Sequence, residues 1–128
     1  MQNCNVLGID VAKESLAVFN QKTKQFFEIP NQEKALKKIV KEQCWKAENY
    51  LVALESTGDY SFLPMQFFSK QGFKIKLLNP IVTKKFTKAT IRGKKTDRSD
   101  AQAIAELAGF GEGQFVTEKD LKITRKTL

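Results

Sequence analysis

Hydrophobic residues along the chain fall into two kinds of pattern, short runs rich in branched and aromatic residues and longer segments with helical spacing. The short runs predict strands at residues 5–11, 16–20, 25–29, 50–54 and 74–78. A polar connector of hairpin length separates the second run from the third. The first three strands are therefore expected to form an antiparallel meander.

The longer segments carry apolar residues at every third or fourth position, which is the spacing of an amphipathic helix. They predict helices at residues 31–43, 61–70, 81–89 and 97–109. Asn31 follows Pro30 and is expected to be the N-cap of the first helix. The order β-β-β-α-β-α-β-α-α predicts an α/β fold with a mixed sheet and helices on both faces.

The length and composition are typical of one globular domain. A chain of 128 residues can bury a real core, and a hydrophobic content of 41% is typical of a folded domain. The aromatic residues expected to pack in this core, rather than to stack on nucleic-acid bases, are Trp45, Tyr60, Phe67 and Phe68.

Several kinds of chemistry are excluded by residue types alone. The chain has no histidine, so it has no imidazole base, no Ser-His or Cys-His pair and no His-ligated zinc. Cys4 and Cys44 form no CxxC motif, which argues against a disulfide scaffold and suits a reducing cytoplasm. No apolar run is long enough to span a bilayer and no signal peptide is evident, so we expect no membrane partner.

Positive charge is concentrated in one segment. Between Lys70 and Arg98 there are ten basic residues and one acidic residue, a local net charge of +9 in a chain whose total is +8. Such an excess is typical of surfaces that bind phosphate backbones, although a solvated lysine-rich surface is the alternative. The residues expected to bind nucleic acid are Lys84, Lys85, Lys88, Arg92, Lys94, Lys95 and Arg98.

Four carboxylates stand at positions where a cation could bind them: Asp10, Glu55, Asp97 and Asp100. The first two fall at the ends of apolar strands, and the other two are three residues apart at the start of a helix. Two carboxylates about 4 Å apart repel by about 4 kcal/mol at an effective dielectric constant near 20, so a cluster needs protons or cations. Oxygen ligands without His or Cys select Mg²⁺ or Mn²⁺, and a pair of such ions is typical of phosphodiester chemistry.

Each acid also has a simpler interpretation. Asp97 can be a helix N-cap with Asp100 as its capping-box partner. Asp10 can face a turn at the end of its strand, and Glu55 can pair with a lysine. The combination of the four acids beside the +9 segment favours the metal site.

Three sequence blocks carry a resemblance to a known family: GIDVAK at residues 8–13, LESTG at 54–58 and KTDRSDA at 95–101. Together with the Asn79-Pro80 pair, they resemble the N-terminal domain of the DEDD-type insertion-sequence transposases, the group related to the Piv DNA invertases. The similarity covers roughly residues 5–110.

The resemblance implies a RuvC-like, ribonuclease-H-type fold in which Asp10, Glu55, Asp97 and Asp100 are catalytic and bind Mg²⁺ or Mn²⁺, as two ions. It implies metal-dependent DNA cleavage and strand transfer during transposition. It also implies DNA and a structured guide RNA as partners, and a cytoplasmic, nucleoid-associated location in a bacterial or archaeal cell.

Full-length members of that family carry a second, C-terminal transposase domain with a serine proposed as a nucleophile. The resemblance therefore implies a catalytic domain at residues 1–110 and a linker at 111–128 toward that domain. Gly111 and Gly113 are expected to loosen the chain there. The full-length protein is expected to be a homo-oligomer, and this fragment alone is expected to lack activity if it needs the second domain.

Two other functions compete with the transposase hypothesis. A catalytically silent, basic nucleic-acid-binding module would explain the +9 segment without any metal. An actin-like kinase lobe also opens with a strand carrying Gly-x-Asp, but the turn after Asp10 lacks the residues of a phosphate cradle.

Overall fold

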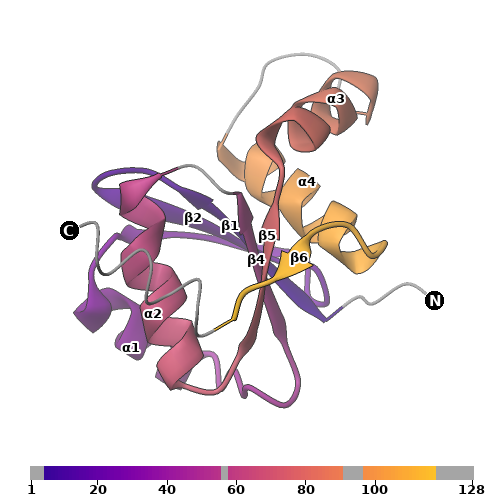
Figure 1. Ribbon diagram of the computed structural model, residues 1–128. Coiled ribbons are helices and arrows are strands. Elements are labelled where there is room, and N and C mark those ends of the chain that lie inside the picture. The colour runs from indigo at the N-terminus through magenta and orange to yellow at the C-terminus, as the bar shows by residue number, and fades with distance from the viewer. Residues whose placement is uncertain (1–4, 56–57, 91–96, 118–128) are drawn as a thin grey trace.

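The computed structural model describes residues 5–55, 58–90 and 97–117. It contains one mixed six-stranded sheet with helices on both faces (Figure 1). The strands are β1 (Val6–Val11), β2 (Ser15–Asn20), β3 (Gln25–Pro30), β4 (Leu51–Glu55), β5 (Lys74–Leu78) and β6 (Gln114–Phe115). The five predicted strands are present within a residue or two of their expected bounds.

The strand order across the sheet is β3-β2-β1-β4-β5-β6. The first three strands form the predicted antiparallel meander. β1 pairs in parallel with β4, and β4 in parallel with β5, so three neighbouring strands end at the same edge of the sheet. β6 adds an antiparallel strand outside β5.

The helices are α1 (Glu33–Glu42), α2 (Phe62–Lys70), α3 (Pro80–Thr90) and α4 (Asp97–Gly109), with a short 3-10 turn, η1 (Asp59–Ser61), before α2. Figure 1 shows α1 and α2 on one side of the sheet and α3 and α4 on the other. The elements follow one another in the predicted order, and β6 is the addition at the end. No helix in the described parts of the chain is long and apolar enough to cross a membrane.

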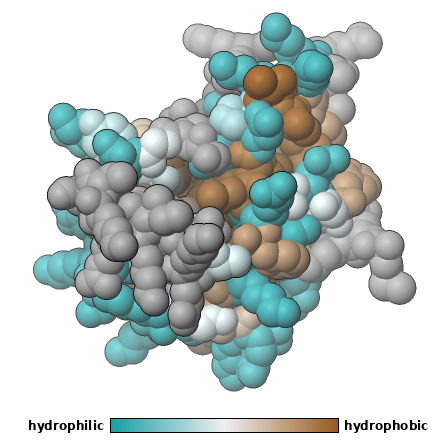
Figure 2. All heavy atoms as spheres, in the orientation of Figure 1, coloured by the Kyte–Doolittle hydropathy of each residue, from teal (hydrophilic) through white to brown (hydrophobic). Residues whose placement is uncertain are grey.

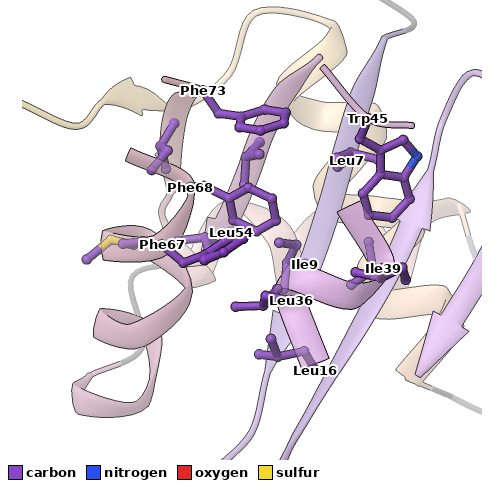
Figure 3. Packing of buried hydrophobic residues seen from close by; sticks show 14 residues of the cluster. Leu7, Ile9, Leu16, Leu36, Ile39, Trp45, Leu54, Phe67, Phe68 and Phe73 are labelled. Carbon is purple, nitrogen blue, oxygen red and sulfur yellow. The ribbon is translucent and has the colours of Figure 1, made fainter. Parts of the chain in front are cut away.

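Alternation along the central strand divides the core into two halves. Leu7 and Ile9 of β1 face α1 and α2, where they pack with Leu36, Trp45 and aromatic residues of α2 (Figure 3). The Phe67 and Phe68 rings meet edge to face with centroids 5.2 Å apart, and Phe68 meets Phe73 in the same way. The core assignment of Trp45, Phe67 and Phe68 is confirmed.

The other half of the core lies between the sheet and α4. Val6 of β1 and Ala53 of β4 pack there against small residues of the helix, among them Ala101 and Ala105. Gly8 lies between these two helix residues: a Cβ built on Gly8 would come within 2.7 Å of the Ala105 Cβ and nearer still to the Ala101 carbonyl oxygen. An alanine-lined helix over a glycine lets the two backbones approach closely.

Three expectations differ from the structure. The N-cap of α1 is Gln32, not Asn31, and it makes no side-chain capping hydrogen bond. Tyr60 is 50% exposed rather than part of the core, because it lies in η1 at the surface. After α4 the chain does not simply loosen: Gly111 and Gly113 adopt positive φ angles and the chain turns back to form β6.

The sheet therefore extends past residue 110, where the sequence placed the end of the catalytic domain. The division into residues 1–110 and 111–128 stays a prediction. Residues 118–128, in the predicted linker, and the predicted loop at 91–95 lie outside the described residues.

Candidate active site

Asp10 is placed by the alternation of β1. It shares a face of the strand with Val6 and Gly8, and this is the face that α4 covers. Its Cα partner in β2 is Ala17, which packs in the same half of the core. The residue is half-buried, because the strand ends one position later. Asp10 therefore lies on the α4 side of the sheet at the carboxyl end of β1.

Glu55 is the last residue of the neighbouring strand β4 and is also half-buried. The final registered pair of these parallel strands is Ile9 and Leu54, and Asp10 and Glu55 each follow it by one residue. Glu55 shares a face with Ala53, which packs against α4. Because neighbouring strands lie about 4.8 Å apart, the two carboxylates emerge side by side at one edge of the sheet.

The first turn of α4 is brought to the same edge by the contact at Gly8. Figure 1 shows α4 starting near the end of β1 and running back toward the beginning of that strand. With Ala101 against Gly8, the residues before Ala101 lie toward Asp10, which is two positions further along β1. Asp100 is half-buried in this turn and immediately precedes Ala101.

Asp97 opens α4, and its side chain lies outside what the structure describes. Asp97 stands three residues before Asp100 in the sequence of this helix. Within the described parts of the chain, no three His, Cys, Asp or Glu side chains come together closely enough to hold a metal ion. The structure therefore aligns Asp10 with Glu55 and sets the Asp100 turn beside them, without assembling a complete set of ligands.

A lysine-rich helix lies beside this edge. Lys84, Lys85 and Lys88 of α3 are exposed, whereas Thr83 and Thr87 on the other side of the helix are buried. α3 packs against α4 on the same side of the sheet as the two strand-end carboxylates.

Arg98 is exposed at the start of α4, with its guanidinium carbon 6.0 Å from the centre of the Phe19 ring. The residues Arg92, Lys94 and Lys95, also predicted to bind nucleic acid, lie outside the described residues.

A cavity of about 660 Å³ opens next to the end of β5. It lies between that strand, the start of α3 and the turn into β6, and Leu78 in its wall is the Cα partner of Glu55. Figure 2 shows hydrophobic residues gathered on this face of the molecule. Ile81 of α3 and Phe115 of β6 are 61% and 55% exposed there. The Lys76 ammonium lies 5.0 Å from the centre of the Phe115 ring.

Two residues near this edge have roles that the sequence pattern did not reveal. Gly8 could have been found, because an isolated glycine in a strand signals a close backbone approach. The role of Asn31 could not have been found. An asparagine that caps a helix and an asparagine that joins two loops are the same residue type at nearly the same position. Its side-chain amide donates to the carbonyl oxygens of Ala12 and Tyr60 instead of capping α1.

Fold and site together define a mixed α/β domain with acidic residues at the carboxyl ends of central parallel strands and a basic helix alongside. A comparison with protein families matches residues 7–125 to a transposase family, the DEDD transposases of the IS110 type. The match spans most of the chain, and the chain belongs to this family. A search of curated proteins finds no match. Family membership supports a role as a transposase in the movement of an insertion sequence.

Proposed function

We propose that this chain is the metal-dependent domain that cleaves and transfers DNA strands in an insertion-sequence transposase, with a RuvC-like, ribonuclease-H-type fold. The six-stranded mixed sheet is compatible with that fold. The observation that carries the proposal is the register of β1 and β4, which aligns Asp10 with Glu55 next to the first turn of α4.

The donor set fits Mg²⁺ or Mn²⁺. Carboxylate oxygens are hard ligands, and neighbouring carboxylates are stabilised when a divalent cation binds between them. In this proposal Asp10, Glu55 and Asp100 hold the cations together with Asp97. When bound, two such ions supply activation of the attacking water or 3′-hydroxyl and stabilisation of the leaving oxygen.

The exposed lysines of α3 would bind the phosphate backbone and hold a strand against this edge of the sheet. Arg98, at the start of α4, would contact phosphate close to the carboxylates. The further parts of the proposal follow from the resemblance: a guide RNA as second partner, homo-oligomers of the transposase, a cytoplasmic, nucleoid-associated location, and inactivity of these 128 residues alone where a second domain is required.

The test is recombination between a plasmid with insertion-sequence ends and a target plasmid, in cells that produce the complete transposase. Asp10→Asn, Glu55→Gln and Asp100→Asn should each reduce recombination to background without lowering the melting temperature of this domain. Glu33→Gln is the matched control, because Glu33 is an exposed acid of α1 on the opposite face. Full activity of Asp10→Asn and Asp100→Asn would overturn the catalytic assignment.

A second candidate function is a catalytically silent nucleic-acid-binding module. The three exposed lysines of α3 favour it, because they would bind phosphates with or without metal. Filter binding in EDTA and in Mg²⁺ separates the two functions. Equal affinity in both conditions, together with full recombination by the Asp10→Asn transposase, would establish the silent module.

A further inference from the structure

Asn31 occupies the junction between β3 and α1. Its backbone N–H donates to the carbonyl oxygen of Glu14 at 3.0 Å. Its side-chain nitrogen donates to the carbonyl oxygens of Ala12 at 3.0 Å and Tyr60 at 3.1 Å. One residue therefore contacts two separate turns, although it contributes nothing to the cap of the helix that follows.

The two turns are those that leave the strands of the candidate site. Ala12 follows Asp10 by two residues in the turn between β1 and β2, and Tyr60 follows Glu55 by five residues in η1. The strand pairing between β1 and β4 is registered only as far as Ile9 and Leu54. Beyond that pair, the side chain of Asn31 bridges the two segments that continue past the carboxylates.

The amide is held in one orientation. Both N–H groups of its nitrogen point at carbonyl oxygens, so the flipped amide would place Oδ1 against two acceptors. Asn31 Oδ1 is enclosed and has no hydrogen-bond partner among the residues that the structure describes. The amide thus uses both of its N–H donors and leaves its oxygen without a hydrogen bond. This is the arrangement expected of a side chain whose role is to join two carbonyl groups.

We propose that Asn31 is a positioning residue for the candidate metal site. Asp10 and Glu55 are each paired with an outer strand, and by joining the turns after β1 and β4 Asn31 holds their separation where the pairing between β1 and β4 has ended. The inference rests on the proposed function, because the separation matters only if the two carboxylates bind one cation. Mg²⁺ tolerates little departure from octahedral geometry at 2.0–2.1 Å, so a shift of roughly 0.5 Å between ligands weakens binding.

The test is the affinity of the domain for Mn²⁺, measured by electron paramagnetic resonance of the free ion. Asn31→Ala should weaken binding by about 10-fold or more, the effect typical of residues that orient metal ligands. Asn31→Asp should also weaken it, because the carboxylate keeps the shape but donates nothing. If only the electrostatic attraction between the new carboxylate and the cation mattered, Asn31→Asp would bind Mn²⁺ more tightly. Tighter binding would therefore overturn the proposal.

The matched control is Asn20→Ala. Asn20 is a buried asparagine at the carboxyl end of β2 whose side chain makes three hydrogen bonds, to the Tyr50 hydroxyl and to two backbone N–H groups, against two for the side chain of Asn31. Its loss should lower the melting temperature and leave Mn²⁺ affinity unchanged. A merely structural role for Asn31 would make the two alanine variants behave alike.

The outcomes also separate this inference from the proposed function. If the unmodified domain and Asn31→Ala bind Mn²⁺ equally well, the positioning role is wrong and the metal site stands. If the unmodified domain binds no Mn²⁺, and Asp10→Asn is indistinguishable from it, the metal site itself is wrong and the positioning role is overturned with it.

Discussion

Replacing Gly8 with alanine tests the close approach that brings α4 to the carboxylates. The new Cβ would lie 2.7 Å from both the Cβ and the backbone nitrogen of Ala105, and closer still to the carbonyl oxygen of Ala101. Carbon atoms in contact need about 3.5–4.0 Å, so the helix must move away from β1 by roughly 1 Å. Overpacking of this kind costs about 1–3 kcal/mol, and backbone neighbours favour the upper part of that range.

For a domain of this size that cost corresponds to a melting temperature lower by roughly 5–15 °C, which differential scanning calorimetry resolves. Ala105→Gly should fail to rescue the variant, because the backbone atoms of Ala101 and Ala105 remain in the way. The same displacement moves Asp100 relative to Asp10, so Mn²⁺ affinity should fall by about 10-fold or more.

Gly72→Ala is the comparison that separates reduced stability from altered geometry. Gly72 has a φ of +90° and follows α2 on the opposite face, so alanine there is strained without touching α4. This variant should be destabilised and should keep its Mn²⁺ affinity. A Gly8→Ala protein that melts within about 2 °C of the unmodified domain would refute the close approach of α4 and β1.

Two further predictions concern the core and the basic helix. Phe68→Ala should cost about 3–5 kcal/mol in urea denaturation, because its fully buried ring contacts two other aromatic rings, and a cost under 1 kcal/mol would contradict that packing. Removing the charges of Lys84, Lys85 and Lys88 should make the affinity for duplex DNA less dependent on salt. The slope of log affinity against log salt concentration should become shallower by about 0.9 for each phosphate that is no longer neutralised. An unchanged slope would show that the DNA binds elsewhere.

Local patterns in the sequence were sufficient for the individual elements. Branched and aromatic runs mark five of the six strands in the described residues, and the alternation in β1 explains why Leu7 and Ile9 face one layer of helices. β6 was missed because it consists of two exposed residues after a pair of glycines, which is too short to show alternation of apolar and polar residues. They form a strand only because the edge of β5 is available to pair with them.

The candidate site shows where sequence reasoning stops. Four acids could be singled out, but the pairing of β1 with β4, which aligns Asp10 with Glu55, depends on long-range contacts that no local pattern encodes. The error at Asn31 has a similar cause. The N-cap of α1 lies one residue later than predicted. The amide of Asn31 therefore bonds to two turns of the site and not to the helix.

The most direct test of the metal site is diffraction from crystals of this domain soaked in Mn²⁺, with the anomalous signal locating the ion. We expect a peak within coordination distance of a carboxylate oxygen of Asp10 and of at least one of Glu55, Asp97 and Asp100. No peak at the carboxyl ends of β1 and β4, in crystals where Mn²⁺ reaches that edge of the sheet, would show that these carboxylates do not form a metal site.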